Sequence, residues 1–221
     1  MLLNRGDFRG HLYIVMDMLH CDLYAHLAEG GLKGLSMPDC KTLAIQLIQA
    51  MGYWQKLQII HADIKPENVL LERSNSLDIR VIDFGSGAAV GKTLYQYIQS
   101  RYYRAPEVIL GYEYDYLIDT WSMACVFYEL FTGQPIFPGD DEFDQLGKIC
   151  EVLGYPDPDY IKNAPRRNEF FWEAGPNRYM LRTNHKVGSR TLKNEMKGAD
   201  DTYIELIESM IKWRPKERMT P

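Results

Sequence analysis

Two short stretches decide how this 221-residue sequence is interpreted: HADIKPEN (residues 61–68) and VIDFG (residues 81–85). Asp63 and Asp83 lie on expected loops at the ends of apolar runs, where functional side chains tend to gather. Lys65 and Asn68 stand between these two acids in the sequence. An acid, a lysine and an amide beside a second acid are the groups that phosphoryl transfer needs.

Each of these residues has a definite role in that chemistry. Asp63 would accept the proton of the attacking hydroxyl, and Lys65 would balance the charge of the moving phosphoryl group. Asn68 and Asp83 would hold Mg²⁺, which binds few protein oxygens and completes its shell with substrate phosphates. One aspartate or asparagine in a loop is more often a turn or capping residue. The functional interpretation therefore depends on the joint spacing.

That spacing resembles the protein-kinase catalytic loop followed by the D-F-G metal-binding turn. The resemblance covers almost the whole chain, since Ala105-Pro106-Glu107 matches the A-P-E signature and DTWS (residues 119–122) the start of a central helix. It implies that Asp119 holds the catalytic-loop backbone and that Arg218 pairs with Glu107. It also implies that His61 packs against Phe84.

The kinase resemblance implies an α+β fold that is mainly helical. Residues 1–19 correspond to a remnant of the small lobe with the hinge strand, and residues 20–221 to the large lobe. The activation segment is expected at 83–107 and a group-specific insert at about 157–199. The chain is expected to end before the last helix of that lobe. The sequence contains no G-x-G-x-x-G loop, so we expect this chain alone to be weak or inactive.

The same alignment implies a site for ATP beside the hinge. Met16 corresponds to the gatekeeper, and Asp17 and Leu19 offer backbone groups to adenine. Asp22 and Glu67 are expected near the ribose. Leu70 is expected under the base. ATP and Mg²⁺ are the implied cofactors.

The stretch YQYIQSRYYR (residues 95–104) is similar to the activation loop of the dual-specificity tyrosine-regulated (DYRK) kinases, within the CMGC group. These enzymes phosphorylate their own second loop tyrosine, here Tyr97, and then Ser or Thr of other proteins, often with Pro following and Arg upstream. Arg101 and Arg104 are the expected partners of the added phosphate. Tyr95 and Ser100 belong to the same loop. Ala62 replaces the arginine that most kinases carry before the catalytic Asp, where DYRK kinases carry Cys.

Two alternatives to an active kinase also arise from the sequence. A kinase fragment without catalysis could bind substrates or partners. A nucleotide hydrolase is disfavoured, because GAAVGKT (residues 87–93) has three residues between its glycines where a P-loop has four.

Composition narrows the partners and the location. The net charge of −5 argues against nucleic acid, and no apolar run is long enough to cross a membrane. Four scattered cysteines fit neither zinc nor disulfides, so we expect a cytoplasmic and/or nuclear protein. Protein substrates are implied by the kinase resemblance. No metal besides Mg²⁺ and no oligomeric state follows from the sequence.

Hydrophobic patterning predicts the main elements of secondary structure. We expect a buried strand at 11–18, a helix at 37–55 capped by Ser36, a hairpin from 68–71 and 79–82, a buried helix at 117–131 ending near Gly133, and amphipathic helices at 140–153 and 202–213. Residues 157–199 carry aromatics but little periodicity, so they are expected to be irregular.

Overall fold

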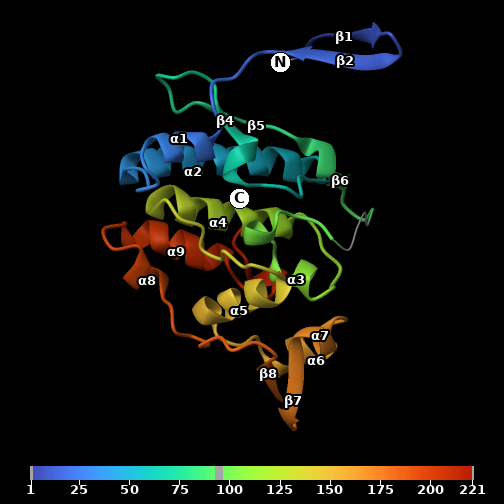
Figure 1. The fold of residues 1–221 in the computed structure, drawn as a ribbon, viewed down its shortest axis with the longest axis vertical. Coiled ribbons are helices and arrows are strands. Elements are labelled where there is room, and N and C mark those ends of the chain that lie inside the picture. The colour runs from blue at the N-terminus through green and yellow to red at the C-terminus, as the bar shows by residue number, and fades with distance from the viewer. Residues whose placement is uncertain (1, 93–96, 221) are drawn as a thin grey trace.

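The computed structural model describes residues 2–92 and 97–220. Its elements form layers along the long axis, from hairpin β1–β2 at one end to hairpin β7–β8 at the other (Figure 1). Up to residue 92 they are β1 (Leu2–Phe8), β2 (His11–Met16), α1 (Leu23–Glu29), α2 (Met37–Lys56), β3 (Ile59–Ile60), η1 (Pro66–Asn68), β4 (Val69–Leu71), β5 (Ile79–Val81), η2 (Phe84–Ser86) and β6 (Ala88–Ala89). From residue 97 they are η3 (Arg101–Tyr103), α3 (Pro106–Ile109), α4 (Leu117–Thr132), α5 (Glu142–Leu153), α6 (Pro158–Asn163), α7 (Arg167–Phe170), β7 (Phe171–Gly175), β8 (Arg178–Leu181), α8 (Leu192–Glu195), α9 (Asp201–Met210) and η4 (Pro215–Glu217).

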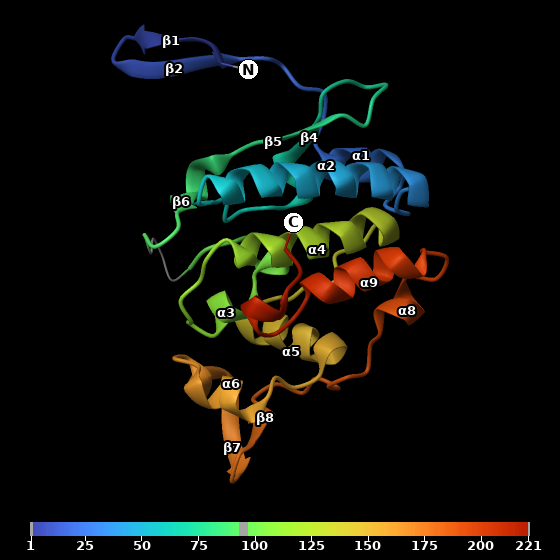
Figure 2. The same cartoon turned by 180° about the vertical axis from the view of Figure 1, so that it is seen from behind.

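Helix α4 is the centre of the core. Its residues 117–130 are all buried, as an all-round apolar helix requires. It packs between α2 and α9, seen most clearly from behind (Figure 2). Gly133 ends it with φ +75°, and a Cβ there would lie 2.1 Å from the Leu32 carbonyl oxygen. The predicted buried helix and its glycine end are confirmed.

Helix α2 and hairpin β4–β5 carry the catalytic loop between them. Ser36 caps α2 by accepting the backbone N–H of Asp39 at 3.3 Å, as predicted. The predicted hairpin is also confirmed, with Val69 opposite Val81 in an antiparallel register. This pairing brings residue 68 and residue 83 to the same end of the hairpin.

The predicted strand at 11–18 exists as β2, but the expectation that it is buried is wrong. Every residue of β2 is exposed, because its one strand partner among the described residues is β1. An apolar run alone does not determine burial, which depends on what covers the strand.

The segment 157–199, expected to be irregular, contains α6, α7, hairpin β7–β8 and α8. Its aromatics anchor these short elements: Phe170 and Phe171 are buried, and the Phe170 ring lies 5.1 Å from that of Phe143 on α5. Elements of four to six residues are too short to show a hydrophobic period. Of the helices in the described parts of the chain, none has both the length and the apolar character for a membrane crossing.

Candidate active site

The catalytic loop is anchored from below by Asp119, on the first turn of α4. Its Oδ2 accepts the backbone N–H of His61 at 2.7 Å and its Oδ1 that of Ala62 at 2.9 Å. The indole Nε1 of Trp54 donates to the same carboxylate at 3.2 Å. Burial raises the pKa of Asp119 to about 6, although these three donors lower it. The contact expected of Asp119 is present, and it holds Ala62 at φ +66°.

His61 connects the two halves of the site. Burial lowers its pKa, so the ring is neutral at pH 7. With the proton on Nε2, the ring donates to the Ile82 carbonyl at 2.9 Å, while Nδ1 accepts the backbone N–H of Asp63 at 3.2 Å. Its ring lies 4.4 Å from that of Phe84, the contact expected between them. The neutral ring therefore fixes the loop that carries Asp63 relative to the turn that carries Phe84.

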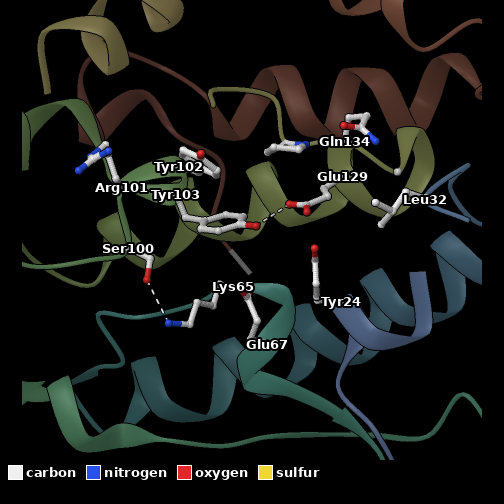
Figure 3. A pocket seen from close by; sticks show the side chains of 12 residues that line it. Tyr24, Leu32, Lys65, Glu67, Ser100, Arg101, Tyr102, Tyr103, Glu129 and Gln134 are labelled. Carbon is white, nitrogen blue, oxygen red and sulfur yellow. Dashed lines mark hydrogen bonds between the residues drawn. The ribbon is translucent and has the colours of Figure 1, made fainter. Parts of the chain in front are cut away.

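Asp63, Lys65, Asn68 and Ser100 form one hydrogen-bonded cluster. The Asp63 carboxylate accepts from Lys65 Nζ at 2.9 Å, from Asn68 Nδ2 at 3.0 Å and from Ser100 Oγ at 2.7 Å. Lys65 also donates to Ser100 Oγ at 3.1 Å (Figure 3). Burial raises the pKa of Asp63, but the bonds from Ser100, Lys65 and Asn68 outweigh this and leave it lowered. Asp63 is therefore ionised at neutral pH and able to accept a proton.

Asp83 and Asn68, the predicted Mg²⁺ ligands, each carry a side-chain oxygen that could bind a cation. Asp83 has φ +62° and is exposed, and its Oδ1 accepts the backbone N–H of Gly85 at 3.1 Å. Ile82 donates its N–H to the Asn68 carbonyl at 3.0 Å, which keeps the two segments adjacent. The side-chain nitrogen of Asn68 donates to Asp63, which leaves the Asn68 side-chain oxygen as the atom that would bind a cation. Within residues 2–92 and 97–220, no three His, Cys, Asp or Glu form a metal cluster. A sparse oxygen pair fits Mg²⁺ that is carried by nucleotide phosphates.

The end of the activation segment is locked by a buried ion pair. Arg218 donates to both Glu107 oxygens at 2.6 Å, and their side chains are 0% and 1% exposed. The Arg218 guanidinium also donates to the carbonyls of Leu117 and Lys212 at 2.9 and 3.0 Å. The pairing expected of Arg218 and Glu107 is present.

Tyr97 is exposed and stacks on an arginine. The Arg104 guanidinium carbon lies 4.0 Å from the centre of the Tyr97 ring, and Arg104, followed by Arg101, lowers the pKa of the phenol. Arg101 and Arg104, the residues expected to bind a phosphate on Tyr97, both lie close enough to act on its hydroxyl. Arg104 is buried and already donates to Glu142 and to two backbone carbonyls. Tyr95 lies outside the described residues.

The residues expected around ATP lie along the hinge and β4. Met16 is 65% exposed, Asp17 is exposed and Leu19 is half-buried. Asp22 forms a backbone bridge with Leu70, and its side chain accepts a backbone N–H at 2.8 Å as the cap of α1. The Asp22 carboxylate thus already has a structural bond in addition to any contact with a ribose.

A cleft of about 490 Å³ opens beside the cluster, and its polar wall was not predicted (Figure 3). Glu129 of α4 accepts from the Tyr103 hydroxyl at 2.6 Å. Burial raises the pKa of Glu129 to about 7, and the Glu67 carboxylate across the cleft adds to the rise. Glu67, expected near the ribose, lines this cleft together with Lys65. A glutamate inside the apolar run of residues 123–131 is the sequence signal that could have identified Glu129.

Comparison with known proteins agrees with this geometry. Residues 6–221 match the protein kinase domain. Over nearly all of its length the chain is 40% identical to serine/threonine-protein kinase ppk5 of Schizosaccharomyces pombe. It is also 40% identical to dual specificity tyrosine-phosphorylation-regulated kinase 2 of Drosophila melanogaster, and 37% identical to dual specificity tyrosine-phosphorylation-regulated kinase 4 of Homo sapiens. It spans 26%, 31% and 42% of those proteins' lengths. The chain therefore belongs to the protein kinase domain family, and it is similar throughout to the family's DYRK members.

Proposed function

We propose that this chain carries the catalytic half of a DYRK-type protein kinase, which transfers the terminal phosphoryl group of ATP to a Ser or Thr hydroxyl of a protein. The observation that carries the proposal is the Ser100 hydroxyl, 2.7 Å from a carboxylate oxygen of Asp63 and 3.1 Å from Lys65 Nζ. The cluster thus already accommodates a serine hydroxyl between a proton acceptor and a cation.

The mechanism follows from the charges of these groups. Asp63 is ionised and takes the proton of the attacking hydroxyl, and Lys65 stabilises the negative charge on the transferred group. The oxygens of Asn68 and Asp83 would hold Mg²⁺. When bound, Mg²⁺ and ATP supply the phosphoryl group and neutralise charge on its oxygens.

Two features support a substrate with a basic residue upstream and proline downstream. Glu67 and Glu129 give the cleft beside the cluster two carboxylates, which would attract an arginine. Near Asp63, the Gln99 carbonyl accepts from Arg104 at 2.8 Å, so it is not free to bind the N–H of a substrate residue. Proline lacks that N–H and loses nothing there.

We also propose autophosphorylation on Tyr97. Its ring is exposed, and the neighbouring arginines already lower the pKa of its hydroxyl. A phosphate on this oxygen would be close to Arg101, which donates to carbonyls of residues 139 and 140 but whose buried Nε has no partner among the described residues.

The alternative is a module that binds substrates or partners without catalysis. The exposed apolar hairpin β1–β2 favours it, since such surfaces serve as contact sites.

The test is mass spectrometry of the 221-residue chain expressed in bacteria, with peptide phosphorylation measured on the same samples. We expect slow phosphate incorporation on Tyr97 and on a Ser-Pro peptide, and none in Asp63→Asn or Asp83→Ala. Incorporation that survives in Asp63→Asn would refute the assignment of the base. A folded wild-type chain that incorporates no phosphate would favour the binding module.

A further inference from the structure

Hairpin β7–β8 has one buried face and one exposed face. Along β8, Tyr179 and Leu181 are buried, whereas Met180 between them is 36% exposed. Trp172 of β7 is paired with Met180 and is 44% exposed. Because successive side chains of a strand point to opposite faces, Trp172 and Met180 are neighbours on the outer face of the hairpin. Two large apolar side chains therefore lie side by side in contact with solvent.

Two arginines flank this apolar pair. Arg178 and Arg182 lie two positions before and after Met180, so they belong to the same face, and both are exposed. Arg182 continues the strand pairing, because its backbone N–H donates to the Phe170 carbonyl at 2.9 Å. Its side chain donates to the Asn168 carbonyl at 3.1 Å, and among residues 2–92 and 97–220 no carboxylate lies within 4.0 Å of either guanidinium. The hairpin face is defined as Trp172, Arg178, Met180 and Arg182.

The segment that carries the hairpin face is basic, although the chain as a whole is acidic. Residues 157–199 hold nine Lys or Arg and five Asp or Glu, a net charge of +4, whereas all other residues hold 16 and 25, a net charge of −9. Hairpin β7–β8 lies at one end of the molecule, away from hairpin β1–β2 at the other (Figures 1 and 2). An anionic partner is therefore attracted to this end and repelled by the rest of the chain.

The spacing of the two arginines matches an extended partner segment. Four residues of a strand span about 13 Å, and the side chains at positions i, i+2 and i+4 of an extended peptide share one face with this same spacing. A peptide that lies along β8 with carboxylates at i and i+4 therefore reaches Arg178 and Arg182 together. Its side chain at i+2 then covers Trp172 and Met180. The pattern is symmetric, so it fits in either chain direction.

We propose that the hairpin face is a docking surface for an extended acidic segment of a partner protein, with an apolar residue midway between two acidic residues four positions apart. This role goes beyond the proposed function, because the hairpin takes no part in the catalytic cluster and docking needs no phosphoryl transfer. Single-stranded nucleic acid also combines negative charge with rings that stack on tryptophan. It is disfavoured, because it brings many phosphates towards a chain whose other residues carry −9, whereas the peptide brings two charges.

Fluorescence anisotropy with labelled probes tests the proposal on the 221-residue chain. The main probe is a short peptide with the core Glu-Gln-Leu-Gln-Glu, which has no hydroxyl and so cannot accept phosphate. The comparison probes are a peptide of the same composition with the core Glu-Glu-Leu-Gln-Gln, and single-stranded oligothymidine of similar length. We expect the main probe to bind about 2- to 5-fold more tightly than the rearranged peptide, because one ion pair is lost there. Its affinity should fall as salt is raised from about 50 to about 300 mM.

Two surface variants and a matched control locate the binding. Trp172→Ala should weaken binding of the main probe roughly 5- to 10-fold, and Arg178→Glu combined with Arg182→Glu roughly 10-fold or more. Lys56→Glu combined with Arg73→Glu changes the total charge equally at two exposed residues outside the hairpin. This control should leave the affinity within about 2-fold, since salt screens distant charges. All the altered side chains are exposed, so unfolding midpoints should stay unchanged.

The proposal is overturned if the wild-type chain binds the main probe no better than the rearranged peptide, or if the control pair weakens binding as much as the arginine pair. Tighter binding of oligothymidine than of the main probe also overturns it and indicates a nucleic-acid surface. So does self-association that Trp172→Ala abolishes, measured by sedimentation, because the hairpin face is then an interface between copies of the chain. None of these outcomes depends on phosphoryl transfer, so failure of the kinase proposal leaves this test intact.

Discussion

The buried pair of Arg218 and Glu107 allows a quantitative prediction. Replacing Arg218 by Met leaves the Glu107 carboxylate without its partner in a site where both side chains are at most 1% exposed. Removing one partner of such a pair costs about 3–5 kcal/mol. Each of the two lost hydrogen bonds to carbonyls adds about 1 kcal/mol, and relaxation of the surrounding structure recovers part of this total. We therefore expect Arg218→Met to lower the free energy of unfolding by about 4–6 kcal/mol.

The chain offers a matched control on its surface. Arg214 also makes a two-pronged contact with a carboxylate, that of Asp157, at 2.7–3.0 Å, but the two side chains are 44% and 46% exposed. Solvent screens that pair, so Arg214→Met should cost at most about 1 kcal/mol.

Urea unfolding followed by tryptophan fluorescence measures the stability of both variants. Trp121 also reports on the Arg218 site directly, because the Arg218 guanidinium lies 5.2 Å from its ring. A loss near 5 kcal/mol could unfold the chain outright, given typical stabilities of about 5–15 kcal/mol. Two further variants then decide: Arg218→Lys keeps the charge and should be milder, and Glu107→Gln combined with Arg218→Met should recover at least half of the loss. The reasoning is refuted if the double variant is less stable than the sum of the two single effects, or if Arg214→Met costs as much as Arg218→Met.

Three more predictions concern the site and the insert. Ser100→Ala removes the strongest hydrogen bond that lowers the pKa of Asp63, so the acid limb of the kcat/KM profile should move to higher pH; a profile that does not move contradicts a link between this hydroxyl and the base. Since the pKa of Glu129 is raised to about 7, an arginine-containing peptide should bind more tightly as pH rises from 6 to 8, and Glu129→Gln should abolish that trend while leaving a peptide without arginine unaffected. Gly147→Ala would place a Cβ 2.0 Å from the His185 ring, which lies between two carboxylates at 2.8 and 2.9 Å, so thermal unfolding should show a loss of about 1–3 kcal/mol that His185→Ala in the same chain reduces.

Local sequence was sufficient where one segment carries the whole signal. The catalytic loop and the D-F-G turn could be identified because their residues lie within a few positions of one another. The central helix could be predicted because it is apolar on every side, and its glycine end because a left-handed residue closes helices.

The remaining features depend on contacts between distant segments. β2 reads as a buried strand, yet its exposure is set by its neighbours rather than by its own residues. Glu129 meets Tyr103 across 26 positions, and Gln99 meets Ser122 across 23. The hydrophobic periodicity of a sequence carries no information about pairs of residues so far apart along the chain. The burial of Arg104, and its bonds to Glu142 and to backbone carbonyls, became apparent only with the structure.

The glycine that ends α4 has a consequence for the cleft it lines. Opposite Gly133, a Cβ on Gly34 would lie 1.8 Å from the Phe131 carbonyl oxygen, and Leu35 donates its N–H to the Leu130 carbonyl at 2.7 Å. Two main chains thus touch with no side chain between them, at one wall of the cleft. The spacing of the two segments at that wall is consequently set by direct contact between their backbones and not by side-chain rotamers. A side chain at either glycine would clash with the opposite backbone, so the two segments could not keep this spacing.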